Sequence, residues 1–307
     1  MLLNYLLRRF LQALGVLVGI SFVTFLLLYF LPADPARMVA GRSATPETVE
    51  QIRRELGLDQ PFPQRYASYL WGLVQGDMGR SYVQKAAVSD IIASRFIPTL
   101  QLALAGILFE LLIGLPSGII AALKRGTWVD QLFMSTAFLG VSAPQFVVGL
   151  LLLYLFSYLL PIFPLGGYGS VAHIILPAIT VGLAGGGWYA RVTRSAMIDV
   201  LRQDYVKTAR AKGVFPRRLL FKHILKNATL PVVALVGLDI GVFMGGIVIV
   251  ESVFGWPGIG QMIWQAIQLV DVPVILGGVL VTACFVVVGN LVADLIYPLL
   301  DPRIQYG

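Results

Sequence analysis

The chain has 307 residues, of which 57% are hydrophobic and 13% are charged. Soluble domains carry about 25% charged residues, so this composition excludes a water-soluble globular domain and indicates a protein of the lipid bilayer. The net charge of +7 invites a nucleic-acid partner, but we expect none, because the basic residues are distributed as membrane orientation requires. The single cysteine excludes an intrachain disulfide and a thiolate metal site.

The first predicted element is an N-terminal anchor helix within residues 1–31. Arg8 and Arg9 precede an uncharged run from Phe10 to Leu31. The apolar part of a secretory signal has about 7–15 residues, whereas a helix that spans a bilayer needs about 20. The length of the run therefore favours an uncleaved membrane helix.

Residues 32–97 are predicted to form a small extracytoplasmic subdomain. They carry eight basic and seven acidic side chains, far more than the segments around them. Thr45–Glu47 has the pattern of a helix start. Gly57 and the prolines that follow, at 61 and 63, predict a break in this helix.

Six membrane-spanning helices are predicted. Lipid offers no hydrogen-bond partner to the backbone, so an apolar segment of this kind crosses a bilayer as a helix. The stretch Gln131–Ala190 has no Lys, Arg, Asp or Glu, and the prolines and glycines of 161–169 divide it into two helices. We expect an all-α polytopic membrane protein. The predicted spans are 9–31, 98–123, 131–160, 173–195, 229–251 and 273–298.

The basic residues of the short loops predict the orientation. Residues 199–228, called here the basic insert, contain eight Lys and Arg against two acids, and the loop 124–130 is also basic. The opposite short loops, 161–172 and 252–272, contain no Lys or Arg. Cytoplasmic loops carry the excess of Lys and Arg, so the basic insert and both termini are expected in the cytoplasm. Arg191 and Arg194, before the insert, are expected to extend to the inner surface.

The basic insert is predicted to contain two short helices. Asp204–Lys212 reads as a helix, Gly213 permits a turn, and Pro216 starts the second helix. On charge alone, the insert is a solvated loop that fixes the topology. A stiff helix with defined ends that protrudes from a membrane domain is also a place where a partner can exert force.

Catalytic motifs are missing from the sequence. There is no G-x-x-x-x-G-K-[ST] phosphate loop, no H-E-x-x-H and no G-x-S-x-G. His173 and His223 fall on opposite sides of the predicted membrane and cannot share a metal ion. We therefore expect no enzyme activity, no metal site and no cofactor in this chain.

Several segments, in order along the chain, resemble the permease subunits of ABC importers of the dipeptide and oligopeptide type. The same permease type serves importers of glutathione and of nickel complexes. The resemblance implies a type I ABC importer permease core over residues 98–300, in the bacterial cytoplasmic membrane. The segments that carry it are Leu31–Ala36, Leu56–Pro61, Gly76–Tyr82, Tyr205–Gly213, His223–Pro231 and Glu251–Gly260.

The resemblance also implies partners and a mechanism. Such importers contain two permease subunits, two cytosolic ATPases that bind ATP and Mg²⁺, and an extracytoplasmic solute-binding protein. The second permease is expected to be a different chain. Alternating access would carry the solute inward, and residues 32–97 and 252–272 would face the binding protein.

The basic insert would act as the coupling loop that receives motion from an ATPase. The family's usual Glu-Ala-Ala falls six residues before the glycine, where this chain has Lys207, Thr208 and Ala209. The acidic residue is missing, so the resemblance implies no particular ionic contact. The residues assigned to ATPase coupling are Asp204, Tyr205, Lys207, Thr208, Ala209, Arg210 and Gly213.

Asp239 is a candidate for the translocation path. Gly237, Gly241 and Gly245 form a ridge suited to close helix packing. Asp239 lies about 200° around the helix from Gly237, so it points away from that ridge. It would then meet a substrate ammonium, or be satisfied by a neighbouring helix. The other acids within predicted spans are Glu110 and Asp294.

The loop after the fifth predicted span holds Glu251, Trp256 and Pro257. These residues are candidates for an outer gate or a contact with the binding protein, and a simple tight turn explains them equally well.

Two other classes remain open. An ion-coupled secondary transporter would use discontinuous helices and inverted repeats around intramembrane ion sites, and would not need the basic insert. A membrane scaffold would transport nothing. Within the importer class, the sequence does not decide between peptides, glutathione and a nickel complex.

Overall fold

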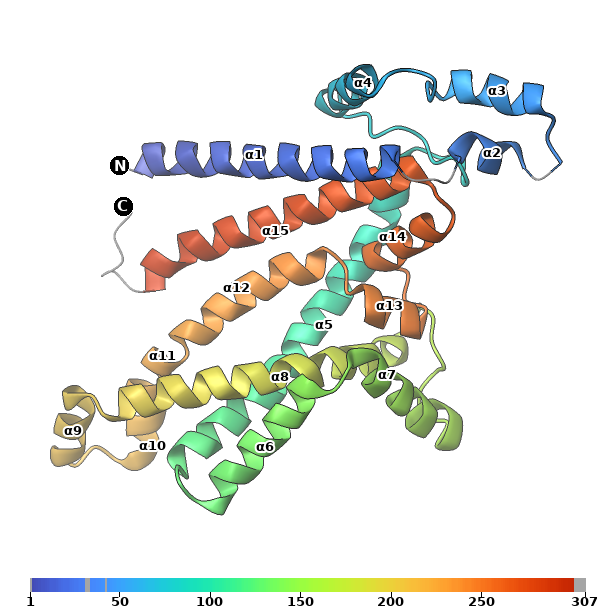
Figure 1. Ribbon diagram of the computed structural model, residues 1–307. Helices are drawn as coiled ribbons and strands as arrows, with labels where there is room; N and C mark the ends of the chain where they lie inside the picture. The colour runs from blue at the N-terminus through green and yellow to red at the C-terminus, as the bar shows by residue number, and fades with distance from the viewer. Residues whose placement is uncertain (1, 31–33, 42, 301–307) are drawn as a thin grey trace.

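The computed structural model describes residues 2–30, 34–41 and 43–300, and all of its regular elements there are helices. This confirms the predicted all-α class. Long helices extend between two ends of the molecule (Figure 1). One end carries α2–α4, and the other carries α9 and α10 together with the start of α1 and the end of α15.

Four helices are long and apolar enough to cross a membrane on their own. They are α1 (Leu2–Tyr29), α5 (Val88–Leu123), α8 (Val171–Leu201) and α15 (Val272–Leu300). Two bent pairs of helices raise the number of possible spans to six among the described residues, so the predicted number is reached only when each bent pair counts as one span.

The first bent pair corrects the predicted span 131–160. Helix α6 (Trp128–Ser142) and helix α7 (Gln145–Leu153), which continues as a π-helical turn, meet at 97°. The break falls at Ala143, whose ψ of 128° is extended. A residue before proline avoids the helical conformation, and Pro144 follows directly, so the sequence itself contained the reason for the bend.

The predicted span 229–251 is also too long. Helix α12 (Leu230–Met244) ends at a glycine pair, and Gly246 has a φ of +100°, a conformation that favours glycine. The chain then forms the short helices α13 (Val248–Phe254) and α14 (Ile259–Gln268). The segment α10 (Pro216–Arg218) to α11 (Leu225–Ala228) precedes α12 and makes the second bent pair with it, at 46°.

The segment 32–97 contains three short helices and the start of a long one. These are α2 (Pro35–Ala40), α3 (Pro46–Glu55), α4 (Phe62–Val74) and the first turns of α5. Thr45 caps α3, as predicted. The prolines at 61 and 63 open α4 instead of leaving a loop, because proline is well tolerated in the first turn of a helix.

Glycines let α5 and α8 pack with their backbones in close contact. A Cβ atom at Gly114 would lie 2.4 Å from Cβ of Tyr189, and one at Gly118 would lie 2.5 Å from the carbonyl oxygen of Ala190. On α8, a Cβ at Gly182 would lie 2.5 Å from Cβ of Phe109. Small residues drive such contacts between helices in membranes. The α5–α8 pair is closely packed, and α6 and α12 lie against both of its helices.

The glycine ridge of α12 packs on α15. A Cβ at Gly241 would lie 3.0 Å from Cα of Gly289, and one at Gly245 would lie 2.7 Å from Cγ2 of Thr282. The prediction that this ridge packs on a neighbour is confirmed. Asp239 therefore points away from α15, toward α8.

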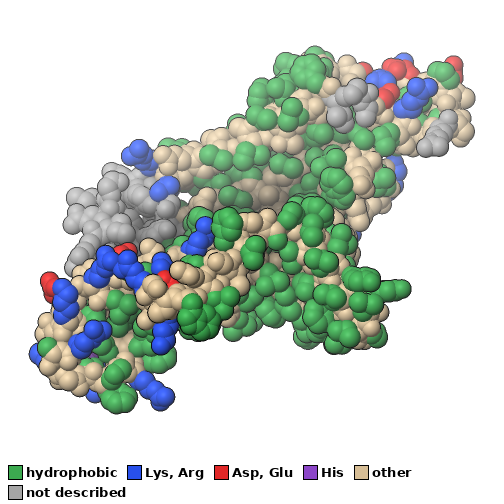
Figure 2. All heavy atoms as spheres, turned by 60° about the horizontal axis from the view of Figure 1, so that its bottom comes forward, with side chains coloured by type: hydrophobic (Ala, Val, Ile, Leu, Met, Phe, Trp, Pro, Cys, Tyr) green, Lys and Arg blue, Asp and Glu red, His purple; other side chains and the backbone are tan. Residues whose placement is uncertain are grey.

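The charged side chains are distributed as a membrane protein requires. In Figure 2, Lys and Arg gather at the end formed by α9–α11, and hydrophobic side chains cover most of the central band of the same face. Apolar side chains there are exposed in the isolated chain, including Phe138 (61%) and Leu139 (66%) of α6. Such a band is suited to contact with lipid or with another membrane subunit.

Candidate functional site

The basic insert folds into two short helices joined by a turn, as predicted. Helix α9 (Asp204–Ala211) ends one residue before the predicted boundary. Gly213 has a φ of +73° and makes the turn, and Pro216 opens α10. A π-helical turn then leads into α11.

Helix α9 has a buried face and an exposed face. Val206 is 1% exposed and packs with Met197 of α8 and with Leu219 and Ile224 of the returning chain. Lys207, Thr208 and Arg210 are exposed. The buried face fixes α9 to the end of α8, so a force applied to the exposed face reaches a membrane helix directly.

A polar contact fastens α9 to α11. The side-chain amide of Asn227 donates to the hydroxyl of Tyr205 at 2.7 Å, and this hydroxyl lies 3.4 Å from the carbonyl oxygen of His223, to which it donates. Tyr205 belongs to the segment Tyr205–Gly213, and His223 and Asn227 belong to His223–Pro231, the two segments of the insert that resemble the importer permeases. The contact explains why a tyrosine and an asparagine occur together there.

Lys207 has a partner inside α9. Its Nζ lies 2.8 Å from Oδ1 of Asp204, and both side chains are exposed. The hydrogen bond and charge of Lys207 lower the pKa of Asp204 below its usual value. The cation that stands in place of the family's glutamate is thus paired with an acid one turn earlier.

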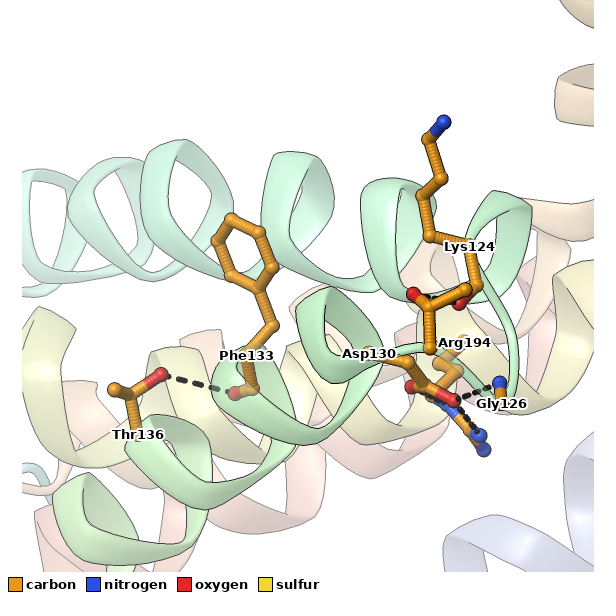
Figure 3. Close-up of polar contacts among 7 residues, drawn as sticks. Lys124, Gly126, Asp130, Phe133, Thr136 and Arg194 are labelled. Carbon is orange, nitrogen blue, oxygen red and sulfur yellow. Dashed lines mark hydrogen bonds and ion pairs between the residues drawn. The ribbon is translucent and has the colours of Figure 1, made fainter.

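An ion pair that the sequence analysis missed joins the first turn of α6 to α8 (Figure 3). Arg194 donates Nε and Nη2 to the two carboxylate oxygens of Asp130, both at 2.7 Å. The backbone N–H of Gly126 donates to the same carboxylate at 3.0 Å. The Asp130 carboxylate, 6% exposed, holds the guanidinium in place, while 28% of the Arg194 side chain is exposed, so its extension to the inner surface stays a prediction. Arg191 instead lies over the ring of Trp188, 4.9 Å from its centroid.

On the opposite end, Glu251 organises the loop 255–258 between α13 and α14, called here the outer loop after the side on which it is predicted to lie. Its carboxylate is buried and accepts the backbone N–H groups of Gln261 at 2.7 Å and Ile247 at 3.3 Å. A Cβ at Gly258 would lie 2.2 Å from Glu251 Oε1, and one at Gly260 would lie 2.9 Å from Oε2. Because Gly258 and Gly260 have no side chains, the Glu251 carboxylate fits against the start of α14.

Trp256 fixes the outer loop to α5. Its indole N–H donates to the carbonyl oxygen of Pro98 at 2.9 Å, and the N–H of Ile259 donates to Thr99 Oγ1 at 2.8 Å. Trp256 is 2% exposed. Glu251 and Trp256 are thus closed to solvent in this conformation and offer no surface for a binding protein, while Pro257 is half-buried. Their role in an outer gate stays a prediction.

A second buried carboxylate at the same end of the molecule, Asp271, escaped the sequence analysis. It accepts the N–H of Tyr82 at 2.9 Å and of Val83 at 3.3 Å, together with the hydroxyl of Ser81. It therefore ties the loop before α5 to the start of α15. A pocket of about 420 Å³ lies beside this loop, and Asp77 and Tyr82 line it.

Asp239 of α12 meets α8 in the membrane domain. The hydroxyl of Tyr189 donates to its carboxylate, which is half-buried. Glu110 of α5 is 3% exposed and lies within electrostatic reach of Asp239. The side chain of Asp294 lies outside the described part of the structure.

The fold is similar to that of solved ABC importers. The chain matches two crystal forms of the MetNI methionine ABC transporter in inward-facing conformations, with TM-scores of 0.53 and 0.58 at 18% and 16% identity. Each match covers 68% of this chain and 96% of that one. An amino acid ABC transporter with histidines matches with a TM-score of 0.51 at 18% identity, over 70% of this chain and 95% of the other. The fold is that of the membrane subunit of a type I ABC importer.

The sequence comparisons are more specific. The family "Binding-protein-dependent transport system inner membrane component" matches residues 114–306, and the N-terminal family of the same membrane component matches residues 2–103. The chain is 42% identical over 305 residues to the "Glutathione transport system permease protein GsiC" of Escherichia coli strain K12, and 41% identical to that of Shigella flexneri serotype 5b. Each alignment covers 99% of this chain and 100% of the relative. The chain belongs to the family of inner-membrane components of binding-protein-dependent transport systems, and it is a multi-pass ABC importer permease.

Proposed function

We propose that this permease carries small peptides inward across the bacterial cytoplasmic membrane, with the tripeptide glutathione as the favoured cargo. The observation that supports this cargo is the full-length identity of 42% to a permease named for glutathione transport. Di- and oligopeptides remain within the proposed class, since they share a peptide backbone and charged termini with glutathione. No contact in the described residues favours a nickel complex.

In this proposal, ATP is hydrolysed on two separate cytosolic subunits, which bind ATP and Mg²⁺, and α9 receives their motion. Helix α9 supports this role because its exposed face is free of contacts with the rest of the described insert, while Val206 and Tyr205 fix the other face. Helix α9 packs on the end of α8, and the Asp130–Arg194 ion pair joins α8 to α6, so a displacement of α9 would be passed to both helices. A second permease, expected to be a different chain, completes the pathway.

The proposed orientation places both termini in the cytoplasm and α2–α4 outside. The start of α1, the end of α15 and the basic insert lie at one end of the molecule, which supports this assignment (Figure 1). Cytoplasmic surfaces carry the excess of Lys and Arg, and the insert is the most basic segment of the chain. The solute-binding protein would then dock at the end formed by α2–α4 and the outer loop.

The test combines uptake with subunit association. Proteoliposomes that contain the two permeases and the two ATPases are supplied with loaded binding protein outside and ATP inside. We expect glutathione uptake that requires ATP, and loss of ATPase co-purification when residues 204–213 are replaced by a Gly-Ser linker. Uptake driven by an ion gradient without ATP would instead identify a secondary transporter, and ATPase retention after the replacement would contradict the role of α9.

A further inference from the structure

Two carboxylates from distant parts of the sequence meet inside the membrane domain. Glu110 lies on α5 and Asp239 lies on α12, and α12 packs against both α5 and α8. Tyr189 of α8 donates to Asp239, and Gly185, one turn earlier on the same helix, lies against the carboxylate of Glu110. Three helices therefore contribute one group each to a polar junction in an apolar domain.

The packing of α8 leaves room for the carboxylate of Glu110. A Cβ at Gly185 would lie 1.7 Å from Glu110 Oε1, so any larger residue there would displace the carboxylate. Glu110 lies on the face of α5 that carries a glycine at every fourth position, namely Gly106, Gly114 and Gly118. These glycines allow α8 to pack closely against α5. Helix packing alone would be served by another small residue at position 110. A carboxylate there adds a cost in free energy that packing does not explain.

The hydrogen bonds of this junction are incomplete. Tyr189 donates its hydroxyl hydrogen to Asp239, and a hydroxyl has only one hydrogen to give. Within the described residues, Oε2 of Glu110 is buried and has no hydrogen-bond partner. Among the ion pairs of these residues, none involves Glu110 or Asp239. Buried carboxylates are normally paired with a cation or fully hydrogen-bonded, so this pair has the character of an incomplete binding site.

We propose that Glu110, Tyr189 and Asp239 bind the primary ammonium group of the transported solute. An ammonium group has three hydrogens, which match the two carboxylates and the free lone pair of the Tyr189 hydroxyl. Two carboxylates are too few for Ca²⁺, which takes six to eight oxygen ligands, and this favours a monovalent organic cation. The inference rests on the proposed function, because glutathione and other small peptides each carry a free amino group.

The order of contact follows from exposure. Asp239 is half-buried and Glu110 is buried, so Asp239 is the more accessible of the two and the ammonium group meets it first. Its arrival at Glu110 requires α12 to move relative to the α5–α8 pair, which the glycine contacts hold together. A movement of α12 is also what the bent connection from α11 would deliver, since the insert continues into α12 through that bend.

The first experiment measures ATP-dependent glutathione uptake in proteoliposomes that contain the complete transporter. Glu110→Gln and Asp239→Asn keep the shape of each side chain and remove its charge. Lys124→Gln, which removes a charge from an exposed side chain at the end of α5 far from Glu110, is the control. Loss of a charged hydrogen bond corresponds to about tenfold or more in affinity, so we expect at least about tenfold weaker half-saturation in the two variants and no change in the control.

The second experiment separates ammonium binding from a structural role. Binding of radiolabelled glutathione is measured on the nucleotide-free transporter in nanodiscs without the binding protein, with N-acetylglutathione as competitor. The wild type should prefer the free amine by about tenfold, and Glu110→Gln should lose this preference while it retains ATPase subunits and thermal stability. The proposal would be overturned if Glu110→Gln weakened the binding of glutathione and N-acetylglutathione equally, or if it left the preference for the free amine unchanged. Absence of any ATP-dependent glutathione uptake by the wild type would instead contradict the proposed function itself.

Discussion

The two ends of the molecule are held to the membrane helices in different ways. The outer loop is fixed by buried polar contacts, in which Glu251 accepts two backbone N–H groups and Trp256 reaches α5. The basic insert is fixed mainly by apolar packing around Val206, with one exposed polar contact at Tyr205. Buried hydrogen bonds resist displacement because their loss leaves polar groups unsatisfied, whereas a packed apolar face with an exposed outer surface is open to a partner. The comparison indicates a rigidly held end, called here the outer frame, and an end at α9 that would serve the proposed function as an inner lever.

The largest effect is expected in the outer frame. Glu251→Ala leaves the N–H groups of Gln261 and Ile247 without their acceptor and should lower the free energy of unfolding by about 2–5 kcal/mol. Thermal unfolding of the purified permease complex measures this change. Ser252→Ala, at an exposed neighbouring position, is the control and should have little effect. Equal stability of the two variants would show that the buried carboxylate is not what holds the loop.

The next effect concerns the ion pair between Asp130 of α6 and Arg194 of α8. Arg194→Ala removes both hydrogen bonds to Asp130 and should lower the free energy of unfolding by about 1–3 kcal/mol, since the arginine is partly exposed. Uptake should fall further than ATPase association, because the pair connects α8 to α6. A double-mutant cycle with Asp130→Ala tests the pairing, and strictly additive effects would show that the two residues act independently.

A smaller effect is expected at the inner lever. Tyr205→Phe removes the hydroxyl that accepts from Asn227 and should cost about 1 kcal/mol or less, since the contact is exposed. Association with the ATPase subunit, measured by surface plasmon resonance, should weaken a few-fold while the fold is retained. Asn227→Ala in the Tyr205→Phe background should add little. A full second loss would mean that Asn227 has another partner in the complex.

The smallest effect is expected for the exposed pair on α9. Lys207 lowers the pKa of Asp204, so the interaction is present at neutral pH and is lost as the pH falls through the lowered pKa. Asp204→Asn should leave thermal unfolding near pH 7 almost unchanged. It should make ATPase association more sensitive to salt if the unpaired Lys207 then meets an acidic surface. An unchanged salt dependence would indicate that Lys207 does not contact the ATPase.

Local features of the fold were predictable from the sequence, and contacts between distant residues were not. The helix start at Thr45, the turn at Gly213 and the packing ridge of α12 all follow from neighbouring residues. The bend at Ala143 was also local, because Pro144 forbids a straight helix, yet the predicted span 131–160 passed over it. Apolar length identifies a span but does not show that it is straight.

The missed site residues were paired across long sequence separations. Asp130 meets Arg194 from 64 residues away, and Ser81 meets Asp271 from 190 residues away. Which acid meets which base depends on how the helices pack, and one sequence does not contain that information. The glycines were the available signal, since Gly258 and Gly185 mark the space that Glu251 and Glu110 fill.

The most direct test of the inner lever is a site-specific cross-link. A photoreactive amino acid replaces Thr208 on the exposed face of α9, and a control replaces Val74 of α4, which is 79% exposed at the opposite end of the molecule. Irradiation of the transporting complex should join position 208, and not position 74, to an ATPase subunit, with a yield that changes when ATP is added. A complex that takes up solute with ATP but gives no ATPase cross-link from position 208 would contradict the account.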